Sequence, residues 1–394
     1  MFQSLFGVFV IVTFLFPISV KAQTGIELDL STTYTFGEHM TFVAQTKSPL
    51  QIQSASIFIQ DMVQVTTRNE PVVFNEQGIS VYRFDTRQNL VRPFTTIHWW
   101  YELTLADGSR MQSQTQSIRY DDDRFNWQSQ ELNGLRVHWY NGDSDFGLSA
   151  LNAAQAGLQS IASFFPPDLV NLVDIYIYEN ASDLPGGGND WAVGHADSAM
   201  GMLMVVIETG LDQNIQMEQR IPHELMHIML ARHIGAGYQN VPAWLREGMA
   251  TLAEVYPNPE YDRTLMDAAS RDALIPIADL CASFSPQIDS AFLAYAETRS
   301  FTNFLRGGYG SDGLLTLAKT YASGVDCERG PERAFGVSLA KLEQDWRVTT
   351  LGQNNVMAML GNMAPYLGLL CLVVIVPLIG IVNSMRKKEG VANE

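Results

Sequence analysis

The first third of the chain alternates short apolar runs with polar and turn residues. Seven runs have the pattern of half-buried β-strands: residues 26–30, 40–46, 51–60, 71–74, 79–85, 95–105 and 110–120. Ala106-Asp107-Gly108 is a hairpin signal between the last two runs. Seven strands in about 100 residues predict an immunoglobulin-like or fibronectin-like β-sandwich, which we assign to residues 23–125.

Two details of this region refine the prediction. Trp99 and Trp100 are adjacent, so they point to opposite faces of a strand, and one of them belongs in the core. We expect Asp121, Asp122 and Asp123 to form a solvated linker rather than a calcium site. Three consecutive carboxylates diverge and lack the spaced oxygen ligands of a calcium loop.

From residue 130 to residue 350 the pattern becomes mixed. Residues 135–141, 172–180 and 201–208 have the pattern of strands, residues 146–165 that of an amphipathic helix, and residues 212–351 are nearly all helical in pattern. Strands followed by helices predict an α+β domain. The run 199–208 is either an edge strand that pairs with an extended peptide or an ordinary core strand.

Both ends of the chain are strongly apolar. Residues 1–22 have the pattern of a signal peptide that is cleaved before Gln23; an uncleaved signal anchor is the alternative. Residues 361–383 contain an uncharged run that predicts a transmembrane helix in contact with membrane lipid. Arg386-Lys387-Lys388 places residues 384–394 in the cytoplasm, because positive residues stay inside. We expect a single-pass protein of the cell membrane whose domains are extracytoplasmic.

Composition narrows the function further. Acidic residues outnumber basic ones 42 to 25, which disfavours binding to nucleic acid. An apolar content of 46% excludes a disordered chain. Cys371 lies in the predicted membrane span, so Cys281 and Cys327 are the remaining pair. They form either one disulfide or two free buried thiols.

The most specific chemical signal is the HExxH sequence of residues 223–227. On a helix, residues four apart lie about 40° apart in projection, so His223 and His227 share one face and can bind one Zn²⁺ ion. Glu224 is rotated by about 100°, so it reaches a metal-bound water without ligating the metal. Pro222 fits an early turn of this helix.

A catalytic zinc site needs a third protein ligand, and two residues compete for this role. His233 follows His227 by six residues, but a continuous helix rotates it off the metal face, and it fits the C-terminus of the helix before Gly235. Glu247 lies twenty residues after His227 on a second predicted helix. A helix hairpin of this length brings Glu247 back over the two histidines, so we favour Glu247.

HELMH followed by Pro-Ala-Trp-Leu-Arg-Glu-Gly-Met-Ala resembles the gluzincin metallopeptidases, in particular the peptidase MA-like domain. The resemblance covers about residues 135–350 and is highly specific only at 222–254. It implies a zincin-type fold, with His223, His227 and Glu247 as zinc ligands and Glu224 as general base. No Gly-x-Met-Glu-Asn segment is present, so the resemblance does not extend to aminopeptidases.

The chain departs from this pattern one turn after Glu247. Thermolysin-like enzymes carry an acidic residue there that orients a ligand, whereas this chain has Thr251. Glu254 is too far along the helix for us to expect it in that role. For stabilisation of the oxyanion, Tyr295 is our first choice and His195 our second.

The pattern and the resemblance together predict a membrane-anchored zinc endopeptidase that hydrolyses extracytoplasmic polypeptides. The alternative is a non-catalytic surface protein that retains a metallopeptidase fold for binding. Hydrolysis of a non-peptide amide is a third possibility, since one metal centre supports several reactions. The substrate preference and the oligomeric state are not predicted.

Overall fold

A computed structural model of the protein describes residues 26–61, 66–89, 91–185, 194–282, 284 and 287–353, with Tyr366, Leu369, Leu370 and Pro377 as isolated positions. The predicted signal peptide and cytoplasmic tail lie outside the described residues, and so does nearly all of the predicted membrane span. Within the described part, no helix combines the length and apolar character that crossing a membrane requires. The chain divides into two compact units, residues 1–124 and 125–394.

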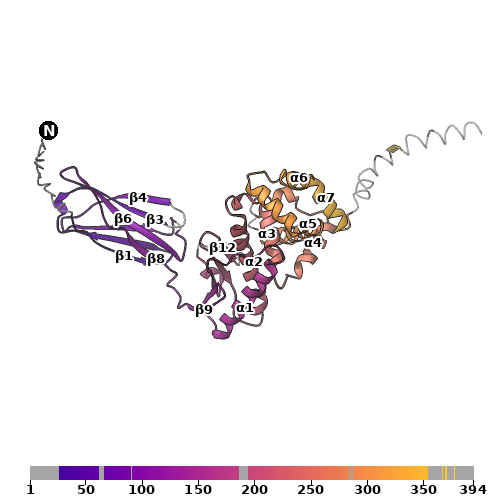
Figure 1. The fold of residues 1–394 in the computed structure, drawn as a ribbon, viewed down its shortest axis with the longest axis horizontal. Coiled ribbons are helices and arrows are strands. Elements are labelled where there is room, and N and C mark those ends of the chain that lie inside the picture. Colours follow the sequence, from indigo (N-terminus) through magenta and orange to yellow (C-terminus); the bar gives the residue numbers. More distant parts are fainter. Residues whose placement is uncertain are drawn as a thin grey trace, which may run out of the picture. The chain divides into compact units, whose positions relative to one another are not determined.

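The first unit consists of two antiparallel sheets that enclose one core (Figure 1). One sheet has the order β1-β2-β5, with β1 at Asp29–Thr35, β2 at His39–Gln45 and β5 at Ile79–Asp85. The other has the order β4-β3-β6-β7, with β8 also paired to β6: β3 Ile52–Asp61, β4 Thr66–Val72, β6 Thr95–Leu105, β7 Arg110–Gln112 and β8 Gln116–Tyr120. The predicted run 110–120 is therefore two strands, and the first strand begins later than predicted.

The pleat of β6 explains the two adjacent tryptophans. Trp99 is 1% exposed and meets the ring of Phe42 edge-on at 5.2 Å between centroids. Trp100 points to the other face and stacks on Phe58. The prediction of a solvated acidic linker is wrong for Asp122, which is fully buried and forms an ion pair with Arg124 at 2.7 Å.

The second unit begins with a five-stranded sheet of order β12-β13-β11-β10-β9. Its strands are β9 Gln128–Leu132, β10 Leu135–Trp139, β11 Val173–Tyr178, β12 Gly194–Asp197 and β13 Met202–Val206. β10, β11 and β13 are parallel, whereas β9 and β12 are antiparallel edges. Of the two alternatives for residues 199–208, the core strand is correct, because β13 is paired with β11 on one side and with β12 on the other.

Helices make up the rest of the second unit (Figure 1). They are α1 Ser144–Ile161, α2 Gln213–Ile234, α3 Ala243–Ala253, α4 Glu260–Ser270, α5 Ile288–Ala322, α6 Gly330–Phe335 and α7 Leu339–Thr349. Short 3₁₀ turns lie at Pro49–Gln51, Ala181–Asp183, Tyr238–Asn240 and Ile277–Leu280. α5 is interrupted at Gly310, whose φ of 72° leaves the helical region. Strands followed by helices confirm the α+β class.

Pro222 lies in the interior of α2, which begins at Gln213, so its predicted place in an early turn is wrong. A proline has no N–H, which leaves the carbonyl of the residue four positions earlier without a helical donor. Here that carbonyl, on Glu218, accepts a hydrogen bond from the backbone N–H of Val255 at 2.9 Å. Gly157 of α1 allows close packing on the proline, since a Cβ there would lie 2.9 Å from the Pro222 ring.

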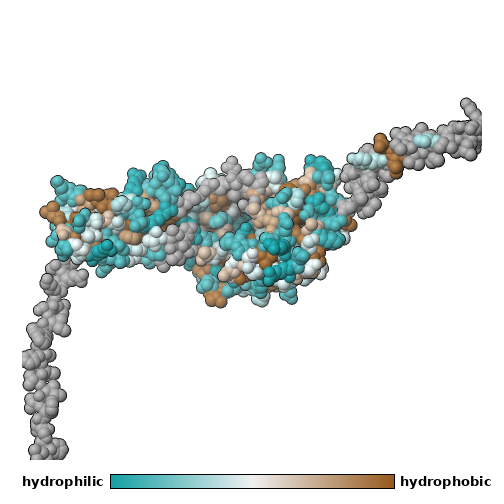
Figure 2. Space-filling view, turned by 90° about the horizontal axis from the view of Figure 1, so that it is seen from above, coloured by the Kyte–Doolittle hydropathy of each residue, from teal (hydrophilic) through white to brown (hydrophobic). Residues whose placement is uncertain are grey.

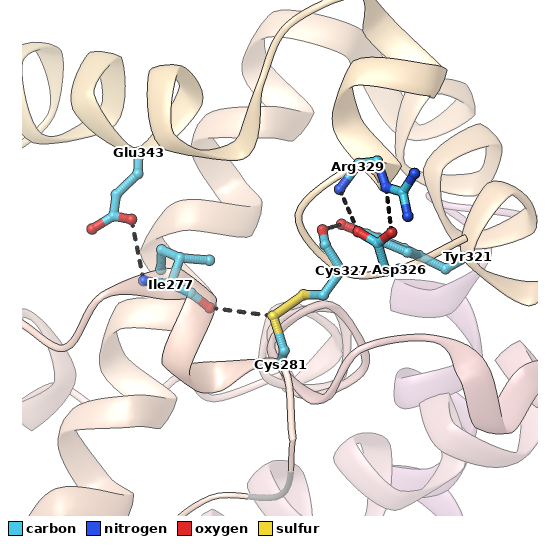
Figure 3. Close-up of a disulfide and its surroundings, with 7 residues drawn as sticks. All are labelled: Ile277, Cys281, Tyr321, Asp326, Cys327, Arg329 and Glu343. Atoms are coloured by element: carbon cyan, nitrogen blue, oxygen red, sulfur yellow. Dashed lines mark hydrogen bonds and ion pairs between the residues drawn. A yellow bond between two sulfur atoms is a disulfide. The ribbon is translucent and has the colours of Figure 1, made fainter. Parts of the chain in front are cut away.

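Cys281 and Cys327 form a disulfide with a Cα–Cα distance of 6.1 Å, which decides between the two alternatives for this pair (Figure 3). The carbonyl of Cys281 accepts the N–H of Ala243, the first residue of α3, at 3.0 Å. The Tyr321 hydroxyl donates to the carbonyl of Cys327 at 2.9 Å. The bridge therefore connects the start of α3 to the chain that follows α5.

The surface of the described residues is mostly hydrophilic on the face in Figure 2, with small apolar patches.

The carboxyl group of Glu297 is buried in the second unit. Glu297 of α5 is 0% exposed, and its Oε1 accepts the N–H of Ile275 at 2.9 Å. Its Oε2 has no hydrogen-bond partner among the described residues. Burial raises the pKa of Glu297 to about 8.

Replacement of Glu297 by Gln should change how stability depends on pH. The folded state holds a proton that the unfolded chain, with a pKa near 4.5, releases. Wild-type stability therefore falls by roughly 1 kcal/mol per pH unit between these two pKa values. We expect the E297Q variant to lack this fall, so that its unfolding free energy gains on the wild type as pH rises from about 5 to 8. Urea denaturation across this range measures the difference; parallel curves for the two proteins would contradict the assignment.

Candidate metal centre

Helices α2 and α3 bring His223, His227 and Glu247 together. One ligand atom from each lies within 4.8 Å of the others. The Nε2 atoms of His223 and His227 lie 3.3 and 3.4 Å from Oε2 of Glu247. The two histidines are one helical turn apart. α2 ends at Ile234, and the next residue, Gly235, has a φ of 71° that favours glycine and lets the chain reverse towards α3.

The three side chains are largely removed from solvent, at 13%, 15% and 18% exposed respectively. Burial alone would raise the pKa of Glu247, but the charges and hydrogen bonds of His227 and His223 outweigh it and lower the pKa strongly. Burial alone would lower the pKa of His223, but its hydrogen bonds to Glu247 and Glu254 raise it. The arrangement therefore holds an ionised carboxylate against two imidazoles.

Each histidine also has a partner on its other ring nitrogen. Nδ1 of His223 lies 3.1 Å from Oε1 of Glu254, and Nδ1 of His227 lies 3.3 Å from the Tyr238 hydroxyl. These contacts leave both Nε2 atoms facing Glu247. Partners of this kind fix the tautomer and the ring orientation of histidine ligands.

The expectation that Glu254 lies too far along the helix is wrong. α3 ends at Ala253, and Glu254 has an extended backbone (φ −53°, ψ 128°), so its side chain leaves the helical spiral. Thr251 instead donates its hydroxyl to the backbone carbonyls of Glu247 and Gly248 at 2.9 and 3.0 Å. In thermolysin-like enzymes the acidic residue that orients a metal ligand lies one turn after the ligating glutamate. In this chain the candidate for that role is Glu254, seven residues after Glu247.

Glu224 lies beside the centre but outside the three-residue group. It is 9% exposed and packs against the edge strand β12. A Cβ on Gly194 would lie 2.4 Å from Oε1 of Glu224, so only glycine fits there with the carboxylate in this place. His195, the next residue of β12, is exposed.

Tyr295 of α5 reaches the same centre. Its ring lies 5.9 Å from the ring of His223 and 5.2 Å from that of Phe284, both measured between centroids. Burial raises the pKa of Tyr295, so the hydroxyl keeps its proton at neutral pH. His233 lies in the last turn of α2, packs on Phe165 and is not part of the three-residue group.

Two nitrogen donors and one carboxylate oxygen fit a divalent metal ion with one position left for water. Sequence reasoning missed Tyr238 and Gly194 as neighbours of the centre and wrongly excluded Glu254. No local pattern marks them, since each depends on how a turn, an edge strand or a helix end is placed.

Comparisons with known proteins give the following matches. No curated protein matches the chain. Among solved structures, OgpA from Akkermansia muciniphila is 16% identical over 25% of this chain and 30% of its own, with a TM-score of 0.20. A polysaccharide deacetylase from Bacillus cereus is 8% identical over 39% and 52%, with a TM-score of 0.23. Cwp6 from Clostridium difficile is 11% identical over 61% and 47%, with a TM-score of 0.17.

The chain thus spans less than two thirds of each of these proteins, and the TM-scores are too low to support an argument about fold or function. The family comparison is stronger. The model of the peptidase MA superfamily matches residues 153–354, half of the chain, and the match includes α2 and α3 with every residue of the candidate centre. The chain therefore belongs to the peptidase MA superfamily.

Proposed function

We propose that this protein is a membrane-anchored zinc-dependent endopeptidase that hydrolyses extracytoplasmic polypeptides. The observation that carries the proposal is the convergence of His223, His227 and Glu247 within 4.8 Å, with the carboxylate of Glu224 beside them. A peptidase domain implies a polypeptide substrate, and the superfamily is usually zinc-dependent.

His223, His227 and Glu247 would hold the ion. When bound, zinc polarises the scissile carbonyl and lowers the pKa of its water towards about 7. The contact of the Tyr238 hydroxyl with Nδ1 of His227 orients that imidazole for this task.

Glu224 is the proposed general base. Its carboxylate accepts the proton of the attacking water and then donates it to the leaving amine. Its place against Gly194 supports this role, because β12 is the edge strand of the sheet among the described residues, and an extended peptide can add to such an edge. A substrate paired with β12 would pass close to the carboxylate.

Tyr295 is the proposed donor to the oxyanion. Its ring adjoins His223, and its raised pKa keeps the hydroxyl protonated, as a hydrogen-bond donor must be. His195 remains the second candidate, since its exposed position on β12 adjoins Gly194.

Membrane anchoring is proposed on the sequence alone. Residues 361–383 supply the apolar span and Arg386-Lys387-Lys388 the cytoplasmic flank. The Cys281–Cys327 disulfide is in keeping with an oxidising, extracytoplasmic compartment.

Replacement of Glu224 by Gln tests the proposal directly. The zinc-loaded wild-type chain should cleave members of a broad peptide library, as detected by mass spectrometry. The E224Q variant should retain zinc and lose about 10²- to 10⁴-fold in rate, because the base is removed and the ligands remain. Glu260→Gln, which removes an exposed carboxylate on α4, should keep full activity. Zinc-loaded wild type that cleaves nothing would favour a non-catalytic binding protein instead.

Replacement of Gly194 by Ala should impair catalysis without loss of metal. The new methyl group would lie 2.4 Å from Oε1 of Glu224, so the carboxylate must move. A shift of about 1 Å in a catalytic group can cost about 10²-fold, and we expect kcat/KM to fall at least about tenfold. Gly308→Ala is the matched control, because a Cβ at this helical position meets nothing within 4 Å. Equal activity of G194A and wild type would show that Glu224 does not depend on this contact.

A further inference from the structure

Glu254 is a buried carboxylate for which the reaction described above provides no role. Its side chain is 5% exposed, and Oε1 lies 3.1 Å from Nδ1 of His223. Its Oε2 is buried and has no hydrogen-bond partner among the described residues. Burial of a charged group in this way is costly unless a neighbouring positive charge compensates it.

The backbone after Glu254 is fixed by an unusual contact. The N–H groups of Val255 and Tyr256 point to the carbonyl of Glu218 in α2, at 2.9 and 3.4 Å. That carbonyl is free because Pro222, four residues later, has no N–H to donate. Because of the proline, α2 thus offers the Glu218 carbonyl as an acceptor beside the point where the chain leaves α3.

This anchor determines where the Glu254 carboxylate lies. A residue that follows the end of α3 can direct its side chain in many ways, but the two residues after Glu254 are held against α2 at Glu218, five residues before His223. The carboxylate consequently reaches Nδ1 of the first histidine. Thr251, which occupies the position one turn after Glu247, has its hydroxyl engaged by backbone carbonyls and offers no carboxylate.

We propose that Glu254 is a positioning residue for the metal ligand His223, and that Pro222 holds it in place through the Glu218 carbonyl. This inference rests on the proposed zinc function. By accepting a hydrogen bond from the Nδ1–H group, Glu254 keeps the lone pair of His223 on Nε2, the atom that faces Glu247, and makes the imidazole a stronger electron donor to the metal. The orienting carboxylate lies seven residues after Glu247, outside its helix.

The test measures zinc affinity, so it does not depend on a known substrate. Wild-type chain and its E254Q, E254A, P222A and E260Q variants are titrated with zinc against a chromogenic chelator. We expect E254Q to bind zinc about 10- to 100-fold more weakly and E254A to bind at least as weakly, since loss of a ligand's partner typically has this effect. P222A should bind a few-fold more weakly, because its new N–H competes for the Glu218 carbonyl. E260Q, which removes an exposed carboxylate on α4, should bind as the wild type does.

A second readout separates positioning from general stability. The metal-free variants are compared by thermal unfolding, and the ¹⁵N-labelled histidines of the zinc-bound forms by NMR. We expect the Nδ1 proton of His223 to give a low-field signal in wild type and E260Q that shifts in E254Q, with similar unfolding temperatures. If E254A does not fold, the nearly isosteric E254Q decides.

The outcomes separate this inference from the proposed function. Wild type that binds zinc while E254Q binds equally well overturns the role of Glu254 and leaves the zinc function standing. Weakened E254Q with unaffected P222A overturns the part assigned to the proline. Wild type that binds no zinc overturns the proposed function and this inference with it.

Discussion

The structure of the second unit depends on one buried interaction, the approach of the Glu247 carboxylate to the imidazoles of His223 and His227. A carboxylate in this position is costly to bury unless positive or metal-bound groups face it. Contacts outside the centre hold the surrounding helices in place. Gly157 lets α1 pack on Pro222 of α2, and the Cys281 carbonyl, secured by the disulfide, holds the first residue of α3. Glu247 reaches α2 because both helices are anchored outside the centre.

Four glutamates illustrate how environment separates residues of one type. Glu247 is buried against two histidines, which lower its pKa strongly. Glu297 is buried without such partners, and its pKa rises to about 8. Glu254 contacts a single ring nitrogen, and Glu224 rests on the backbone of an edge strand. The proposed tasks of Glu247 as ligand, Glu254 as positioning residue and Glu224 as base follow from these surroundings rather than from the side chain itself.

Sequence alone predicts the parts of this protein that depend on local periodicity. The i, i+4 spacing places His223 and His227 on one helix face, and alternation places one of Trp99 and Trp100 in the core, which the structure shows to be Trp99. Sequence-based prediction fails where the role of a residue depends on contacts with residues far away in the sequence. β12 is four residues long and has no periodic pattern, so the sequence does not decide whether its neighbour β13 is an edge strand or a core strand. The usual preference of proline for an early turn misplaces Pro222, because the donor that replaces its missing N–H comes from Val255, thirty-three residues later.

Zinc content of the purified full-length chain and of its Glu247→Ala variant tests the central claim most directly. The account predicts about one zinc ion per wild-type chain and loss or strong weakening of binding in the variant, because the three donors act as one site. A wild-type chain that is purified without chelators and still binds no zinc when zinc is added would contradict the account. Zinc retained by the variant at full affinity would contradict the assignment of Glu247 and return His233 to consideration as the third ligand.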